Sequence, residues 1–409
     1  MSVAPIVIGH GERPNLDRLP YSLRLLVPIA SRLQWGSLTL TLPDGQTLAM
    51  RGREPGKNAV VQIKNYRCLL RLIRAANVGW AEGYLADEWD SPDIAALLEV
   101  FARNSARMRD LYEGRAWTTL AHRLLHFFNR NTRAGAKRNI TAHYDLGNAF
   151  YERWLDPSMT YSSAKFERPD EDLSAAQRNK YLALAQRIEL KPEHSLLEIG
   201  CGWGGFAEFA AKEIGCRVTC ITISREQFDF ARARLFKQGL ADKTDIRLED
   251  YRDTQGTFDR VASIEMFEAV GEDYWPAYFG SIRERLAPQG QAGLQIITID
   301  EQYFKSYRSS VDFIQKYVFP GGMLPSMQAL REQVAGAGLV WRGETNFGLD
   351  YAQTLSRWRG RFLAAWDDIR TLGFDERFKR LWNYYLSYCE AGFRAGSIDV
   401  TQIALRRPA

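Results

Sequence analysis

A glycine-rich segment, LLEIGCGWGGF at 196–206, carries the residues whose types and spacing most clearly suggest ligand chemistry. Gly200, Gly202 and Gly204 follow a short apolar run and precede a pattern typical of a helix. Glycine adopts positive φ readily, and it lets the main chain approach a ligand because it has no Cβ. Glu198 lies just before the first glycine, where a carboxylate would repel a pyrophosphate but attract a cation. The segment therefore predicts a site for a small, positively charged ligand.

Glycine spacing alone leaves other interpretations open. Gly200, Gly202 and Gly205 also satisfy the G-x-G-x-x-G pattern of dinucleotide sites, and tight strand–helix packing alone can require glycine. A Walker loop is excluded because no GK[ST] follows. S-adenosylmethionine carries both an ammonium and a sulfonium group, so it suits the carboxylate of Glu198 better than a dinucleotide does.

The elements around this segment follow an alternating order. From about residue 175, predicted helices alternate with short apolar strands at 194–200, 216–224, 259–270 and 290–299. Such alternation predicts a mostly parallel sheet with helices on both faces, in which ligands bind beyond the carboxyl ends of the strands. The segment GSIDVTQIALRR at 396–407 is predicted to form a final edge strand.

The N-terminal part predicts a separate module. Residues 36–50 alternate apolar and polar side chains around a PDG turn, which is typical of a hairpin. Ser91 and Pro92 are placed to begin a helix as its N-cap and first residue. From Arg115 to Arg138, basic residues are interleaved with aromatic and leucine side chains, and no acid lies between them. This stretch predicts either a helix for an anionic membrane surface or an ordinary inter-domain helix with a solvated basic face.

Composition excludes several classes of protein. The 409 residues carry a formal net charge of +5, and their five cysteines form no pair of CxxC motifs, which favours reduced thiols in the cytoplasm. No HExxH motif is present, so a zinc site is not expected. Neither a secretory leader nor an apolar run long enough to cross a membrane is predicted.

The glycine-rich segment resembles the first motif of class I S-adenosylmethionine-dependent methyltransferases, in the form seen in cyclopropane fatty acid synthases and mycolic acid cyclopropane synthases. Other segments resemble this family in the same order, at 143–166, 222–227, 249–253, 263–271, 313–326 and 347–355, and 78–91 resembles the N-terminal domain of the longer phospholipid enzymes. The resemblance implies a Rossmann-like, doubly wound α/β sheet with a smaller N-terminal α+β domain. It implies a lipid-binding domain at 1–114, a basic amphipathic linker helix at 115–140 and a catalytic domain at 141–409.

The resemblance also implies roles for particular residues around S-adenosylmethionine. Tyr161 and Ser162 match residues beside its methionine part, whereas Thr222 and Gln227 match residues near its ribose and carboxylate. The implied cofactor-binding residues are Tyr161, Ser162, Glu198, Gly200, Gly202, Gly204, Thr222, Ser224, Gln227, Asp250, Tyr251 and Arg252.

The implied reaction is methylation of an alkene, which leaves a carbocation that must lose a proton. Loss from the new methyl group closes a cyclopropane, and loss from a neighbouring carbon leaves a methyl-branched alkene. In cyclopropane synthases the base is thought to be bicarbonate held by cysteine, glutamate, histidine and tyrosine. This chain keeps Glu268 and Tyr351, but it has Ser163 for the cysteine and Ile297 for the histidine. Since isoleucine cannot donate a hydrogen bond, bicarbonate as a cofactor is doubtful.

Taken together, these features predict C-methylation of the double bond of an unsaturated phospholipid acyl chain, with Glu268, Tyr351 and Ser163 as catalytic residues. A methyl-branched product is slightly favoured over a cyclopropane. The expected partner is an anionic phospholipid membrane, with the protein peripheral on the inner face of the cell membrane, and a homodimer is possible by family resemblance. A methyltransferase for a soluble small molecule and a lipid-binding protein without catalysis are the alternatives. Nucleic acid is not an expected partner, because no NPPY-type tetrapeptide is present.

Overall fold

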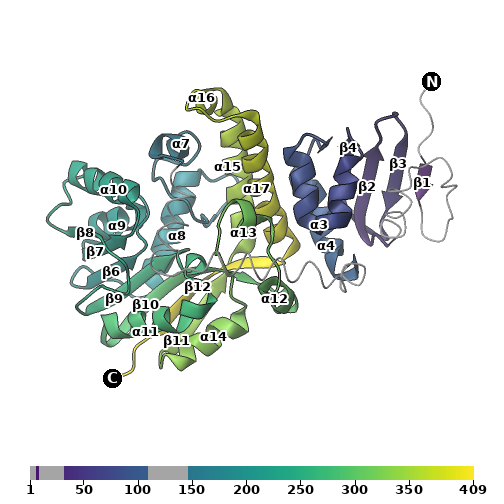
Figure 1. Ribbon diagram of the computed structural model, residues 1–409. Helices are drawn as coiled ribbons and strands as arrows, with labels where there is room; N and C mark the ends of the chain where they lie inside the picture. The colour runs from purple at the N-terminus through teal and green to yellow at the C-terminus, as the bar shows by residue number, and fades with distance from the viewer. Residues whose placement is uncertain (1–5, 9–31, 109–145) are drawn as a thin grey trace. The chain divides into compact units, whose positions relative to one another are not determined.

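The computed structural model describes residues 6–8, 32–108 and 146–409, and the chain divides into two compact units (Figure 1). The first unit comprises residues 1–123 and 373–397, and the second comprises 124–372 and 398–409. The predicted linker helix at 115–140 and both of its boundaries lie outside the described residues. The predicted catalytic domain, 141–409, differs from the second unit because residues 373–397 belong to the first.

The first unit is built on a five-stranded sheet with the order β1-β3-β2-β4-β5. Strands β2 and β3 form the predicted hairpin, in which Leu40 pairs with Leu48 and Thr41 with Thr47. The elements of this unit are β1 (Ile6–Ile8), β2 (Trp35–Thr41), β3 (Thr47–Arg51), β4 (Glu54–Ile63), α3 (Arg67–Leu85), β5 (Trp89–Asp90), α4 (Ile94–Met108) and α17 (Glu376–Ala395).

Helix α4 begins two residues later than the sequence predicts. Its capping side chain is Asp93, whose Oδ1 accepts a hydrogen bond from the Ala96 main-chain N–H at 3.0 Å. Ser91 instead accepts from the Asp93 N–H at 3.3 Å, so it shapes the turn before the helix and is not the N-cap. Aspartate is as good an N-cap as serine, and here it lies three residues before the N–H that it satisfies.

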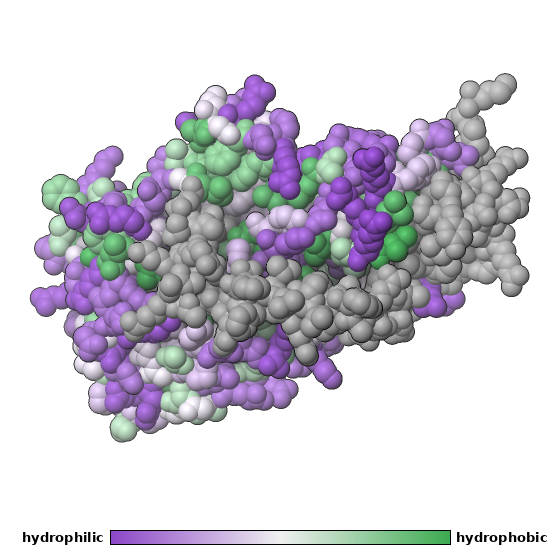
Figure 2. Space-filling view, in the orientation of Figure 1, coloured by the Kyte–Doolittle hydropathy of each residue, from purple (hydrophilic) through white to green (hydrophobic). Residues whose placement is uncertain are grey.

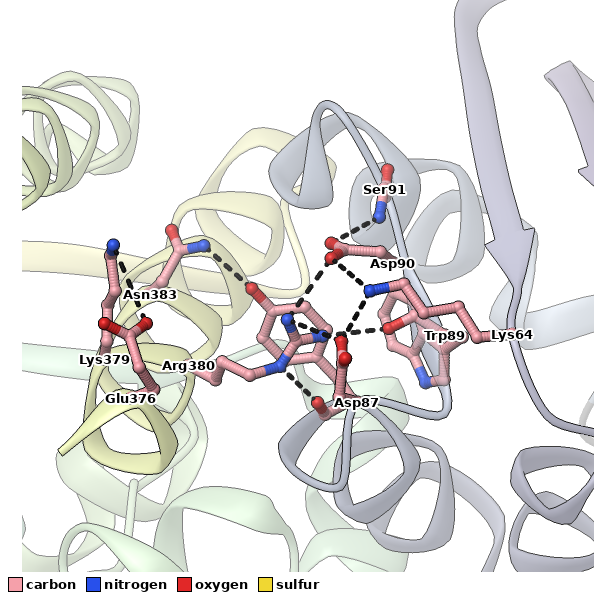
Figure 3. Close-up of polar contacts among 10 residues, drawn as sticks. Lys64, Asp87, Trp89, Asp90, Ser91, Glu376, Lys379, Arg380 and Asn383 are labelled. Carbon is pink, nitrogen blue, oxygen red and sulfur yellow. Dashed lines mark hydrogen bonds and ion pairs between the residues drawn. The ribbon is translucent and has the colours of Figure 1, made fainter.

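Helix α17 is held in the first unit by Arg380 (Figure 3). This guanidinium lies 3.8 Å from the centroid of the Tyr84 ring and donates to the main-chain oxygens of Tyr84 at 2.6 Å and Trp89 at 2.9 Å. It also pairs with Asp87 at 3.1 Å and Asp90 at 3.2 Å. One side chain from near the C-terminus therefore satisfies two carbonyl groups at the end of α3 and in β5.

We expect Arg380→Met to lower the free energy of unfolding of the first unit by about 3 kcal/mol, because two carbonyls lose a charged donor and the cation–π contact is lost. Thermal unfolding followed by tryptophan fluorescence measures this change. The matched control is Lys379→Met, which removes the neighbouring charge of an ion pair that spans 3.8 Å to the exposed Glu376. We expect it to cost less than about 0.5 kcal/mol. Equal losses in the two variants would contradict the role given to Arg380.

The second unit contains a seven-stranded sheet with the order β11-β12-β10-β9-β6-β7-β8. The strands from β10 to β8 run parallel, which confirms the predicted doubly wound sheet. Strand β12 runs antiparallel to both β10 and β11 and lies between them, so the prediction of an edge strand at this segment was wrong. The strands are β6 (Ser195–Ile199), β7 (Arg217–Thr222), β8 (Thr244–Leu248), β9 (Phe258–Ile264), β10 (Leu286–Ile299), β11 (Val340–Asn346) and β12 (Ile398–Arg406).

Helices cover both faces of this sheet, and successive residues of the strands contribute to opposite cores. Leu196 packs in one core with Phe206 and Leu235, whereas Leu197 packs in the other with Phe279 and Leu330. The helices of this unit are α7 (Asn148–Glu152), α8 (Leu173–Arg187), α9 (Gly205–Phe209), α10 (Arg225–Lys237), α11 (Trp275–Arg285), α12 (Glu301–Arg308), α13 (Phe313–Tyr317), α14 (Met327–Gly336), α15 (Gly348–Ala364) and α16 (Trp366–Arg370). A π-helical turn at Ala210–Ile214 continues α9.

The described surface is largely hydrophilic on the face shown in Figure 2, with hydrophobic residues gathered around α16. Leu363 and Leu372, which flank α16, are 38% and 40% exposed. Across the described residues, none of the helices has the length and apolar character needed to cross a membrane. All five cysteines are free thiols, as the sequence predicts.

Candidate active site

The glycine turn connects β6 to α9 and uses the conformational freedom of its glycines. Gly200, Gly202 and Gly204 have φ of +80°, +52° and +81°, a region that other residues enter only with strain. A Cβ on Gly200 would lie 2.7 Å from Met266 Cγ, but a Cβ on Gly202 would meet no atom within 4 Å. The turn is therefore closely packed at its start and open beside Gly202.

Glu198, at the end of β6, is the buried carboxylate beside this turn. It is 3% exposed, and its Oε2 has no hydrogen-bond partner within the described part of the chain. Burial raises the pKa of Glu198 to about 8, against the opposing charge of Lys180. An ammonium group bound at this oxygen would favour the ionised form and lower the pKa again, so Glu198 fits a cationic ligand. Together with the open space at Gly202, this arrangement fits the predicted cationic ligand.

The predicted residues at the ends of β7 and β8 are already ordered by contacts among themselves. Thr222 Oγ1 donates to Gln227 Oε1 at 2.9 Å, and Ser224 caps α10 by accepting from the Gln227 N–H at 3.3 Å. The Arg252 guanidinium binds both carboxylate oxygens of Asp250, at 2.8 and 2.6 Å. The carboxyl ends of β6, β7 and β8 thus bring the predicted cofactor residues to one edge of the sheet.

Ser162 is fixed from helix α8. Lys180 Nζ donates to Ser162 Oγ at 2.7 Å, and Gln177 Nε2 donates to the Ser162 main-chain oxygen at 2.9 Å. The preceding Tyr161 packs against the rings of Trp154 and Trp358. The segment that contains these two predicted residues lies beside the end of the glycine turn, since a Cβ on Gly205, the first residue of α9, would lie 3.1 Å from Thr160 Oγ1.

Glu265, which the sequence analysis did not single out, is the centre of the polar contacts. It follows β9 with φ of +50°, a left-handed conformation that is strained for glutamate. Its Oε1 accepts from the Ser163 N–H at 2.8 Å and from Gln295 Nε2 at 2.7 Å. Its Oε2 accepts from the Tyr351 hydroxyl at 2.6 Å. Burial raises the pKa of Glu265, and the donors from Tyr351, Gln295 and Ser163 oppose that rise.

A second glutamine orients the first. Gln402 Nε2, on β12, donates to Gln295 Oε1 and to the Lys180 main-chain oxygen, both at 3.0 Å. Gln295 and Gln402 are register partners in β10 and β12, and both are fully buried. Because Gln295 accepts at its oxygen, its amide nitrogen faces Glu265 and also donates to the Ser163 main-chain oxygen at 3.4 Å.

Glu268 lies close enough for the two carboxylates to influence each other. Its Oε1 accepts from the Ile297 main-chain N–H at 2.5 Å, and its buried Oε2 has no partner among the described residues. Burial, with the charge of Glu265, raises the pKa of Glu268 to about 8. Glu268 is thus mostly neutral at pH 7, whereas the donors converge on Glu265.

The fold brings Tyr351 and Ser163 together at Glu265, where both donate hydrogen bonds to its carboxylate. Ser163 meets it through its main-chain N–H, because its hydroxyl donates to the Ala164 oxygen at 2.8 Å. Ile297, where the resemblance implies a histidine, contributes its main-chain N–H to Glu268. Phe267 packs with core aromatic rings, including Trp275 and Phe279. Sequence reasoning missed Glu265, and the signal that could have identified it is that it is a second glutamate three positions before Glu268.

Comparison with known proteins identifies the family of the chain. Residues 131–403 match the family model described as mycolic acid cyclopropane synthetase. The chain is 38% identical to tuberculostearic acid methyltransferase UfaA1 of Mycobacterium tuberculosis (strain ATCC 25618 / H37Rv), over 82% of this chain and 80% of that one. It is 34% identical to the cyclopropane-fatty-acyl-phospholipid synthase of Escherichia coli (strain K12), over 91% and 94%.

Solved structures give the same assignment. The mycolic acid cyclopropane synthase CmaA1 complexed with SAH and CTAB is 29% identical, with a TM-score of 0.62 over 66% of this chain and 98% of that one. The cyclopropane synthase MmaA2 from Mycobacterium tuberculosis is also 29% identical, with a TM-score of 0.63 over the same shares. The predicted family, fold and cofactor are thereby confirmed: the chain belongs to the mycolic acid cyclopropane synthetase family and is an S-adenosylmethionine-dependent methyltransferase.

Proposed function

We propose that this methyltransferase acts on the double bond of an unsaturated acyl chain and that Glu265 is the base that removes the final proton. Methylation of unsaturated fatty acyl chains is the activity of the family. The finer assignment to Glu265 rests on one observation. Three donors, from Ser163, Gln295 and Tyr351, converge on this buried carboxylate and stabilise its ionised form.

The same observation argues that no bound bicarbonate is needed. An exogenous anion requires donors to offset its burial, each charged hydrogen bond contributing about 1.5–3 kcal/mol. Here the donors already serve Glu265, whose charge would also repel a second anion. The chain thus carries its own carboxylate in the place of a bound base.

The proposed reaction proceeds in two steps on the lipid. When bound, S-adenosylmethionine would supply an electrophilic methyl group: the π electrons of the alkene would form the new C–C bond, the methyl C–S bond would break, and its electron pair would stay on the sulfur of the departing S-adenosylhomocysteine. The neighbouring carbon is then a cation, and Glu265 accepts a proton from the adjacent C–H bond. The electrons of that bond form either a new double bond or the third side of a ring. Glu268, mostly neutral, leaves the negative charge on Glu265.

For the cofactor we assign Glu198 and Gly202 to its cationic end, with Tyr161 and Ser162 beside its methionine part. Thr222, Ser224 and Gln227 hold the ribose and carboxylate side, and the Asp250–Arg252 pair frames the adenine side. Support comes from the position of the residues from Glu198 to Arg252 at the neighbouring carboxyl ends of β6, β7 and β8, and from the unpartnered Oε2 of Glu198.

We propose a methyl-branched, still unsaturated product. The chain is slightly more similar to a tuberculostearic acid methyltransferase than to the cyclopropane synthase of Escherichia coli. The test is mass spectrometry of oleoyl phospholipid vesicles after incubation with methyl-labelled S-adenosylmethionine, followed by ozonolysis. Retention of the double bond with one added methylene supports branching. Loss of the double bond identifies a cyclopropane, and the absence of label overturns methylation of the acyl chain.

The substrate is proposed to be a phospholipid in an anionic membrane, with the protein peripheral on its inner face and homodimeric. The relative in Escherichia coli is named a cyclopropane-fatty-acyl-phospholipid synthase. The net charge of +5 favours an anionic surface. Co-sedimentation with phosphatidylglycerol vesicles tests this proposal. Failure to bind, combined with turnover of a soluble substrate, would favour the alternative of a small-molecule methyltransferase.

We expect Tyr351→Phe to move the acidic limb of the kcat profile to higher pH. The Tyr351 hydroxyl bonds to the ionised carboxylate of Glu265 and lowers its pKa, so its removal raises that pKa and leaves less base ionised at a given pH. The loss in kcat below the limb is expected to be about tenfold or more. Stopped assays from pH 5 to 9 measure it. A uniform loss at every pH would indicate a merely structural role.

A further inference from the structure

Lys180 is a fully buried charged side chain that the proposed reaction does not use. It lies on α8 with 0% exposure, and its ammonium group contacts the Tyr181 ring at 4.5 Å from the centroid. Within the described chain, Ser162 Oγ at 2.7 Å is its one hydrogen-bond partner. A buried ammonium group has three N–H donors, and leaving it so poorly satisfied is costly. Such a residue is expected to serve the site beside it.

The contact fixes the direction of the Ser162 hydroxyl. An ammonium group can only donate, so Ser162 Oγ must be the acceptor, and its own O–H must point to another acceptor. Gln177, one turn earlier on α8, holds the main-chain oxygen of the same residue. With both its Oγ and its main-chain oxygen anchored, Ser162 offers one donor of fixed position.

We propose that Lys180 is a positioning residue that orients the Ser162 hydroxyl as a donor to the methionine carboxylate of the bound cofactor, in addition to the contacts assigned to Thr222 and Gln227. The inference rests on the proposed placement of Ser162 beside the methionine part of S-adenosylmethionine. The inference identifies Lys180 as the group that makes Ser162 a donor. The ammonium group of Lys180 also places a buried positive charge near the carboxylate of the bound cofactor.

The charge of Lys180 is maintained by carboxylates on neighbouring elements. Burial lowers its pKa to about 7, and the charges of Glu265, Asp156 and Glu198 oppose this fall. Strands β10 and β12, which also pack against α8, contribute the neutral amides of Gln295 and Gln402. Above its pKa the amine can accept the Ser162 proton, which turns the hydroxyl away from the cofactor. The contribution of Lys180 to cofactor binding therefore fades as pH rises.

The test is calorimetric binding of S-adenosylhomocysteine, which keeps the carboxylate and requires no lipid. We expect Lys180→Met to raise Kd about tenfold or more at pH 6.5, a loss typical of one charged hydrogen bond. The ratio of the Kd of this variant to that of the wild type should fall toward one by pH 9. Ser162→Ala should weaken binding similarly, and the double variant should be no weaker than the weaker single variant. Arg178→Met, on the same helix, removes an exposed positive charge that pairs with Glu213; it is the control and should bind as the wild type does.

Several outcomes would overturn the inference. One is a ratio of the Kd of Lys180→Met to that of the wild type that stays constant from pH 6.5 to 9. Another is a double variant in which the losses of affinity of the two single variants multiply. The third is wild-type affinity in Lys180→Met. If Lys180→Met does not fold, Ser162→Ala still tests the inference. The ratio of its Kd to that of the wild type must fall toward one as pH rises from 6.5 to 9. If the wild type itself fails to bind S-adenosylhomocysteine, the proposed cofactor site fails instead, and the two failures are thereby distinguished.

Discussion

Replacement of Glu265 by glutamine is expected to lower kcat by about 10²- to 10⁴-fold, the usual contribution of a general base. Glutamine keeps the size of the side chain and can still accept at one oxygen, but it cannot take the proton that the lipid cation must lose. Binding of S-adenosylhomocysteine should weaken less than it does in Lys180→Met, because Glu265 affects the cofactor only through the charge of Lys180. Single-turnover transfer of labelled methyl to vesicles measures the first quantity, and calorimetry the second.

The matched control is Glu268→Gln, which alters the neighbouring carboxylate of the same buried pair. Because the pKa of Glu268 is about 8, this group is mostly neutral at pH 7, and glutamine resembles its protonated form. Its Oε1 can still accept from the Ile297 N–H. We expect less than about a tenfold loss of kcat. The reverse order of effects, with Glu268→Gln inactive and Glu265→Gln active, would assign the base to the residue that the family resemblance favoured.

Gly202→Ala is expected to weaken binding of S-adenosylmethionine by about 10- to 100-fold without unfolding the chain. The new Cβ would meet no protein atom within 4 Å, so it would project into the open space beside the turn. A methyl group forced into a filled site costs about 1–3 kcal/mol, which corresponds to a change in affinity of this size. Calorimetric titration with S-adenosylmethionine gives the affinity, and a thermal melt confirms that the fold is retained.

A second glycine separates backbone strain from occupation of the site. Gly239 follows α10 with φ of +69°, and a Cβ on it would also meet nothing within 4 Å, but it lies exposed at the end of that helix. Gly239→Ala should cost about the same in stability, roughly 1 kcal/mol, with unchanged affinity for the cofactor. Weakened binding in both variants would mean that strain, and not steric exclusion, explains the effect at Gly202.

Local patterns were sufficient for the glycine turn and the parallel strands. Three glycines after an apolar run favour a turn with positive φ, and the alternation of strands and helices favours a mostly parallel sheet. The position of β12 within the sheet could not be predicted from local sequence patterns. Its apolar pattern identifies a strand, but its place between β10 and β11 depends on pairing with residues about 60 to 110 positions earlier.

Glu265 was missed for a related reason. Its partners come from β10, α15 and the segment before α8, and no spacing in the chain connects them. The polar residues Gln295 and Gln402 lie within otherwise apolar strands, which is the one local signal that a buried network exists. Family resemblance directed attention to Glu268 instead, because it describes a site that holds a separate anion.

The return of α17 to the first unit, followed by β12 in the second, has a consequence during synthesis on the ribosome. The Arg380 anchor and the interior strand β12 are both translated after residue 373. Neither unit can complete its native contacts while the earlier residues emerge. Strands β10 and β11 therefore have main-chain groups without partners until β12 is synthesised and pairs with both. Nascent chains are therefore expected to need protection from aggregation until translation ends, and premature termination should leave no usable half of the enzyme.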